Sequence, residues 1–114
     1  MKIFSDSHLE LAQTASMFAA LGSEQRLQVL RTLVRAGPEG LPIGVLGERC
    51  GVTGSTLTHH VKILCQADLV AQTKQGRSVI CAAVAFDQIT ALSNFLMTEC
   101  CADCEASQEQ ETHD

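Results

Sequence analysis

The chain has 114 residues, of which 46% are hydrophobic and 18% are charged. This length and composition suit one folded domain and argue against a disordered chain or two domains. The formal net charge of −5 at first opposes a nucleic-acid partner, because phosphate binding needs a surplus of Lys and Arg on the surface. However, residues 103–114 hold five acidic residues and no Lys or Arg, so the other 102 residues are neutral overall. The acidity therefore belongs to the C-terminal tail.

No stretch approaches the roughly 20 apolar residues that a bilayer span requires, so no membrane partner is expected. The first residues, MKIFSDSHLE, turn polar after four residues and do not resemble a signal peptide. We therefore expect a cytoplasmic protein. In that reducing compartment the six cysteines are thiols, available for packing, metal binding or redox chemistry.

Two helices are predicted in the first third of the chain. The first ends at Gly22, and the second begins after Ser23, a suitable N-cap, and ends at Gly37-Pro38. The apolar residues at helical spacing are Leu11, Ala15 and Phe18 in the first helix and Leu27, Leu30, Leu33 and Val34 in the second. We expect these apolar faces, with Phe18 and Phe95 among the buried residues, to form part of the core.

A helix-turn-helix arrangement follows. The run EGLPI predicts a loop, with Pro42 at the first turn of a short helix over residues 43–50. Gly51 ends that helix, and Ser55 is the predicted N-cap of a further helix that runs to about Gln66. Two helices joined by such a short turn containing glycine are typical of the helix-turn-helix motif.

Strand-like sequence appears only once, in residues 69–73 and 78–84. The intervening Lys74-Gln75-Gly76-Arg77 contains a glycine suited to a hairpin turn. From Asp87 the helical period returns and continues to about Glu99. The predicted fold is mainly α with a small β-hairpin, a winged helix-turn-helix. Residues 1–99 form its DNA-binding and dimerisation domain, and residues 100–114 form a cysteine cluster and an acidic, disordered tail.

The second helix of the predicted motif has two faces. The residues expected to pack on the core are Leu57, Val61, Leu64 and Cys65, and those expected to face outward are Ser55, Thr58, His59, Lys62 and Gln66. Hydroxyl, imidazole and ammonium groups in one stripe suit phosphate and base-edge contacts in the major groove of double-stranded DNA. An ordinary solvated helix face is the alternative interpretation.

The distribution of charge favours the DNA interpretation. Between Arg49 and Arg77 there are four basic residues and one acidic residue, which gives this segment a charge of +3. Lys74 and Arg77 flank the predicted hairpin turn, from which they could reach a phosphate or the minor groove. Their other interpretation is that they only make the turn soluble.

Three stretches resemble, in order and spacing, the ArsR family of small metal-responsive bacterial repressors: LGSEQRLQVLRTL, STLTHHVKIL and DLVAQTKQGRSVI. The resemblance covers roughly residues 10–98. It implies a winged-helix homodimer that binds a palindromic operator and releases it when an effector binds. The positions that match the recognition helix are Ser55, Thr58, His59, His60 and Lys62, and Gly76-Arg77 match the wing turn. Many members have an aromatic pair in the second wing strand, where this chain has Ile80-Cys81.

A cysteine cluster follows the last predicted helix and consists of Cys100, Cys101 and Cys104. On a continuing helix Cys100 and Cys104 would share a face, and some unwinding would bring all three sulfurs around one ion. Three thiolates form a soft, low-coordinate site that suits As(III) or Sb(III). Zn(II) is the main rival, with His113, Asp103 or water as its fourth ligand. A redox response, through a disulfide or a persulfide, is the second rival.

Comparison with members of the ArsR family also favours an arsenic site at the C-terminal cysteines. Well-known arsenic-sensing members place cysteines at the start of the first helix of the motif, but residues 43–49 contain none. The last helix likewise carries an apolar stripe instead of the ligands of zinc-sensing members. The cluster looks like the C-terminal cysteine-pair sites of another arsenic-responsive branch. Cys50, Cys65 and Cys81 fall on apolar faces and are expected in the core.

These observations predict a repressor that releases its operator when As(III), Sb(III) or a methylated arsenical binds the three cysteines. A redox-responsive or zinc-responsive repressor with the same DNA face is the alternative, and a metal-buffering protein without DNA function is a more distant one. We do not expect an enzyme, because no nucleophile, base and orienting group recur together.

Overall fold

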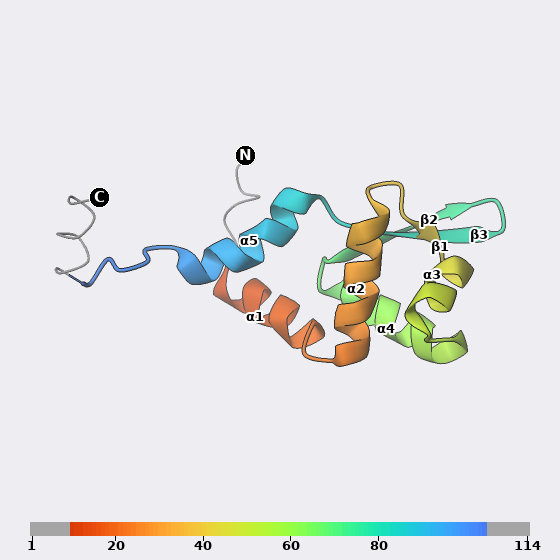
Figure 1. Cartoon of the computed structure of the whole chain (residues 1–114), viewed down its shortest axis with the longest axis horizontal. Coiled ribbons are helices and arrows are strands. Elements are labelled where there is room, and N and C mark those ends of the chain that lie inside the picture. Colours follow the sequence, from red (N-terminus) through yellow and green to blue (C-terminus); the bar gives the residue numbers. More distant parts are fainter. Residues whose placement is uncertain (1–9, 105–114) are drawn as a thin grey trace.

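The computed structural model describes residues 10–104 (Figure 1). Its elements are α1 (Leu11–Ala20), α2 (Glu24–Ala36), β1 (Leu41–Pro42), α3 (Ile43–Cys50), α4 (Gly54–Gln66), β2 (Val70–Gln75), β3 (Ser78–Ala83) and α5 (Phe86–Met97). The mainly helical fold with a small β-hairpin is as predicted. No helix among the described residues is long and apolar enough to cross a membrane.

The first two helices follow the predicted bounds, but α1 presents a different face to the core. Ser23 caps α2 as predicted, because its side chain accepts a hydrogen bond of 3.3 Å from the backbone N–H of Arg26. In α1 the buried residues are Thr14, Met17 and Ala20, whereas Phe18 is 40% exposed and Leu11 is 74% exposed. The prediction that Phe18 is buried is therefore wrong. Leu27 of α2 was predicted on the same core and is 44% exposed, so that prediction is wrong as well. Apolar residues occur all round α1, so their spacing alone does not identify the face that meets the core.

The helix-turn-helix consists of α3 and α4. Helix α3 has the predicted bounds and ends at Gly51, whose φ of 74° is left-handed. Helix α4 begins at Gly54 with Thr53 as its N-cap, so Ser55 lies within the first turn and does not cap the helix as predicted. The turn is tight: a Cβ on Gly47 would lie 2.8 Å from the carbonyl oxygen of Val52. The turn therefore packs directly against the backbone of α3 at Gly47.

The wing is a three-stranded antiparallel sheet in the order β1-β3-β2. Strand β1 was predicted as a loop, but Leu41 pairs with Cys81 and Pro42 pairs with Ile80. Strands β2 and β3 continue to the pair Gln75 and Ser78, which leaves only residues 76 and 77 in the turn. Gly76 has a φ of 61°, as a two-residue hairpin turn requires.

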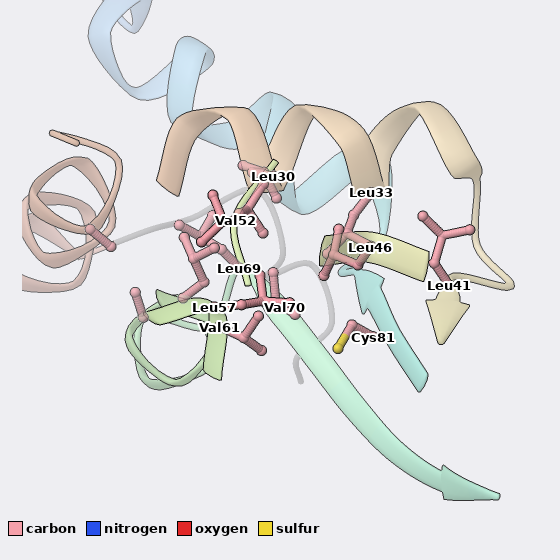
Figure 2. Packing of buried hydrophobic residues seen from close by; sticks show 14 of the residues in the cluster. Leu30, Leu33, Leu41, Leu46, Val52, Leu57, Val61, Leu69, Val70 and Cys81 are labelled. Carbon is pink, nitrogen blue, oxygen red and sulfur yellow. The ribbon is translucent and has the colours of Figure 1, made fainter. Parts of the chain in front are cut away.

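The core lies where α2 crosses α3, α4 and the sheet (Figure 2). Leu33 extends from α2 towards Leu46 of α3, and Leu30 of α2 and Val61 of α4 belong to the same buried cluster. Cys81 of β3 closes the sheet side and is fully buried. This packing places the helix-turn-helix and the wing against the same helix, α2.

Helix α5 packs against α1 at the end of the molecule opposite the hairpin tip (Figure 1). Its buried residues are Ala91 and Leu92, and Phe95 is half-buried instead of fully buried as predicted. The helix ends at Met97, two residues before the predicted end at Glu99. Glu99 and Cys101 both have a left-handed φ, at 64° and 65°, and this geometry cannot continue an α-helix.

Candidate nucleic-acid interface and cysteine cluster

The polar stripe predicted on α4 is exposed. All five of its residues face solvent: Ser55, Thr58, His59, Lys62 and Gln66. The apolar residues of the same helix face inward, with Leu57, Val61 and Leu64 buried and Cys65 half-buried. Thr56 is also exposed and was missed, because it lies outside the 3.6-residue period of the stripe. The helix therefore offers a continuous polar surface beside the turn.

The first turn of α4 adds backbone donors to this surface. No side chain caps the helix, although Thr53 occupies the N-cap position in an extended conformation. The first N–H groups of a helix have no partner within it, and they carry a partial positive charge that favours anions. They lie beside the exposed hydroxyls of Ser55 and Thr56. Both kinds of donor suit the oxygens of a phosphate group.

His60 lies on the opposite side of α4 from the position that the family resemblance gave it. Its side chain is only 8% exposed and faces α2. The reason is helical spacing, because residue 60 is three positions after Leu57 and four before Leu64, both of which are buried. The expectation that His60 faces DNA is therefore wrong.

The tip of the wing carries the two predicted basic residues. Lys74 is near the end of β2, Arg77 is in the turn, and both are exposed. Arg49 at the end of α3 is exposed as well. The basic groups of the +3 segment therefore lie on the surfaces of the helix-turn-helix and the wing.

Three cysteines are core thiols, as predicted. Cys81 is fully buried, and Cys65 and Cys50 are half-buried. Burial raises the pKa of Cys65 and of Cys81 above the ordinary value, because a thiolate loses solvation in an apolar environment. Cys50 donates a hydrogen bond of 3.5 Å to the hydroxyl of Thr32. The raised pKa favours the neutral thiol at these two positions, as expected for cysteines that pack in the core.

The other three cysteines, Cys100, Cys101 and Cys104, are exposed beyond the end of α5. Cys100 and Cys104 do not share a helix face, since the backbone here forms successive turns, with the N–H of Cys104 donating to the carbonyl of Cys101 at 3.0 Å. The sulfurs of Cys100 and Cys101 lie 3.5 Å apart. Within residues 10–104 no three His, Cys, Asp or Glu side chains are already arranged to hold a metal ion. His113, the alternative zinc ligand, and the acidic tail from residue 105 lie outside the described residues.

Helices α1 and α5, which contact each other, both carry large apolar side chains that are exposed. Leu11 and Phe18 of α1 are exposed, and Leu96 and Met97 of α5 are 69% and 58% exposed. Exposed large apolar side chains in adjoining helices are typical of a protein interface. We call this set of four residues the α1–α5 apolar surface.

Comparison with known proteins finds similarity between this part of the chain and bacterial regulators. Residues 21–73 match the family model described as a helix-turn-helix domain. Over 64 residues, 56% of this chain, the sequence is 41% identical to the uncharacterised HTH-type transcriptional regulator YceK of Bacillus subtilis. Over 69 residues, 60% of this chain, it is 38% identical to the HTH-type transcriptional regulator NmtR of Mycobacterium tuberculosis. The matched segments span 63% and 55% of the lengths of these relatives.

The fold has a close structural counterpart in the homodimeric winged helix-turn-helix DNA-binding domain Mb0332 of Mycobacterium bovis, a possible ArsR-family transcriptional regulator. The TM-score is 0.64 at 20% identity, and the match covers 79% of this chain and 82% of the other. The chain therefore has the winged helix-turn-helix fold.

Proposed function

We propose that the chain is a DNA-binding transcriptional repressor of the ArsR type. The observation that carries this proposal is the exposed polar stripe on α4, the second helix of a helix-turn-helix that residues 21–73 share with bacterial regulators. Helix α4 would enter the major groove of double-stranded DNA, where Thr58, His59 and Lys62 face the bases and phosphates. Lys74 and Arg77 at the wing tip would contact the neighbouring backbone or minor groove.

The test is selection of double-stranded DNA from a random-sequence pool by the wild-type protein, followed by affinity measurements on the enriched fragment. Removing a phosphate contact in Lys62→Gln or Arg77→Gln should weaken binding and reduce the slope of log K against log salt by about one. Arg35→Gln is the matched control, because Arg35 is exposed on the side of α2 turned away from Val29 and Leu33. Enrichment of no sequence, or equal losses in all three variants, would contradict the proposal.

The repressor would act as a homodimer through the α1–α5 apolar surface. Dimerisation would cover Leu11, Phe18, Leu96 and Met97, which a monomer leaves in water. The Mb0332 domain with the same fold is homodimeric. A dimer carries two copies of α4, and therefore suits a palindromic operator with two half-sites.

The proposed effector is trivalent arsenic, bound by Cys100, Cys101 and Cys104. The donor set fits this element because thiolates are soft ligands and three of them leave room for the lone pair of As(III). All three side chains are exposed, and the 3.5 Å separation of the Cys100 and Cys101 sulfurs places two donors together. Sb(III) and methylated arsenicals share this chemistry. For each As–S bond formed, the thiol proton leaves with one hydroxide of arsenous acid as water.

A signal from this cluster has a short physical route to the DNA surface. The cysteines follow α5 directly, α5 packs against α1, and α1 packs against α4. Arsenic binding would reorganise the end of α5 beside the dimer interface and change the spacing of the two α4 helices. Such coupling is reciprocal, so DNA should weaken arsenic binding by the same factor.

Arsenite titration into the protein bound to its selected DNA tests the effector. Wild type should release DNA, and the triple variant Cys100→Ser, Cys101→Ser, Cys104→Ser should not. Cys50→Ser is the matched control, because Cys50 is a half-buried thiol outside the cluster. Release by the triple variant would contradict the site. Mass spectrometry separates arsenic from the redox rivals, because an oxidant gives a cysteine bridge and a sulfane-sulfur donor such as a polysulfide gives a persulfide, neither of which contains arsenic. Titration with Zn(II) in place of arsenite tests the zinc alternative.

A further inference from the structure

The buried histidine of the recognition helix α4 has two polar partners in α2. Nε2 of His60 lies 2.8 Å from Oε1 of Gln25. Nδ1 of His60 lies 3.5 Å from Nη1 of Arg26, a long hydrogen bond. Through these two atoms the imidazole joins α4 to the first turn of α2.

Arg26 extends the connection to a third helix. Its Nε donates a hydrogen bond of 2.6 Å to the backbone carbonyl of Ala20, the last residue of α1. The carbonyls of the last turn of a helix have no partner within it, so this bond satisfies one of them. A single chain of contacts therefore runs from the end of α1, through Arg26, to the ring of His60 in α4.

The chemistry of the partners determines where the imidazole carries its proton. A guanidinium only donates hydrogen bonds, so Nδ1 of His60 must be the acceptor facing Arg26. The proton of the neutral ring is then on Nε2, which donates to the Gln25 oxygen. Burial, and then the nearby charges of Arg26 and His59, lower the pKa of His60 and so favour this neutral ring.

We propose that His60 is a positioning residue, which as a neutral ring protonated at Nε2 fixes the recognition helix α4 against Gln25 and, through Arg26, against the end of α1. The proposal rests on the proposed DNA-binding function, and it assigns His60 a role without contact to DNA. Because α1 also packs against α5, the same chain of contacts links the orientation of α4 to the proposed dimer interface.

The first test is the tautomer, measured on the protein without DNA. Long-range proton–nitrogen NMR of the histidine rings at pH 7.5 distinguishes a protonated from an unprotonated ring nitrogen. His60 should show a protonated Nε2 and an unprotonated Nδ1, and Arg26→Met should weaken the preference for this tautomer without abolishing it, because Gln25 still accepts from Nε2. A wild-type ring protonated at Nδ1, or one that exchanges freely between tautomers, would overturn the proposal.

The second test is rescue by a conservative variant. The amide of His60→Gln can still donate to Gln25, whereas His60→Leu fills the site without any polar atom. On the DNA fragment enriched by the wild-type protein, we expect affinity about tenfold lower for His60→Leu and within about threefold of wild type for His60→Gln. Circular dichroism and thermal unfolding establish that both variants are folded. If His60→Leu does not fold, the proposal is tested by the tautomer of His60 from NMR and by the affinity of His60→Gln for the DNA fragment.

Equal affinities of folded His60→Leu and wild type would overturn the positioning role. The failure of the proposed function looks different, because the wild-type protein then enriches no DNA sequence. In that case the tautomer measurement, which needs no DNA, still confirms or overturns the link between the helices.

Discussion

Nε of Arg26 lies 2.6 Å from the backbone carbonyl oxygen of Ala20, so a side chain of α2 holds the last turn of α1. Arg26→Met keeps most of the apolar stem and removes the donors. We expect the free energy of unfolding to fall by about 1.5–3 kcal/mol, the range for hydrogen bonds to charged groups. Urea denaturation measures the change. Arg31→Met, at an exposed position of the same helix, is the control and should change stability by no more than about 0.5 kcal/mol.

Stability should depend on pH through His60, whose pKa in the folded protein is lowered from the ordinary 6.5, first by burial and then by Arg26. Above pH 6.5 the ring is neutral in both the folded and unfolded states, so its contribution is complete. As the pH falls below 6.5, the unfolded chain takes up the proton first and stability is lost until the folded pKa is reached. Urea midpoints between pH 7.5 and 5 should fall less for His60→Gln than for wild type. An equal fall of the urea midpoint in both proteins would show that groups other than His60 cause the pH dependence of stability.

The close approach of α3 to the turn predicts that replacing two of its glycines with alanine has opposite effects on stability. A Cβ on Gly47 would lie 2.8 Å from the carbonyl oxygen of Val52 and 3.0 Å from Cδ2 of Leu57. Gly47→Ala should therefore destabilise the protein by about 1–3 kcal/mol. Gly44 has no atom within 4 Å of the same position, so Gly44→Ala should stabilise the protein by about 0.4–1 kcal/mol. Thermal unfolding of the two variants shows whether each substitution stabilises or destabilises the protein. An undiminished stability of Gly47→Ala would show that the turn can relax.

The oligomeric state should depend on the α1–α5 apolar surface. Leu96→Glu places a charge where the proposed dimer buries a leucine, and burial of such a side chain contributes about 1.5–3 kcal/mol. Sedimentation equilibrium should show weaker association by at least about tenfold. Leu27→Glu is the matched control, because Leu27 is 44% exposed on α2. Equal association of both variants with wild type would exclude this surface as the interface.

Deletion of residues 105–114 removes four acidic residues and no Lys or Arg. Operator affinity should stay the same or increase slightly, because less negative charge then opposes the phosphates. Fluorescence anisotropy on the selected DNA measures the effect. Loss of binding would show that the segment has a structural role.

The sequence predicted most of the fold because its signals were local. Gly51 defines the end of α3, Ser23 the start of α2 and Gly76 the hairpin turn. Strand β1 was missed because two residues carry no periodicity, and pairing with β3 depends on tertiary structure. Phe18 was placed in the core because its helix is apolar on more than one side, and the exposed side has no partner within the described residues.

Helical spacing correctly predicted which residues of α4 are exposed, whereas the family resemblance alone wrongly placed His60 on the exposed face. Ser55, Thr58, His59 and Lys62 follow one stripe and are exposed. His60 breaks that stripe, and its spacing from Leu57 and Leu64 already indicated the core face. Its partners Gln25 and Arg26 lie 35 and 34 positions away in the chain, a distance over which sequence pattern carries no information.

Strand β1 passes into α3 without an intervening residue, and its two residues pair with β3 in the wing. The wing and the helix-turn-helix are thus connected directly, without a linker residue, and α2 packs against both. On DNA such a unit would measure a set interval along the duplex between the groove that receives α4 and the phosphates under the wing tip. The wing tip would therefore reach the backbone at one fixed distance from that groove, whatever the sequence between them, because the protein has no linker there to stretch.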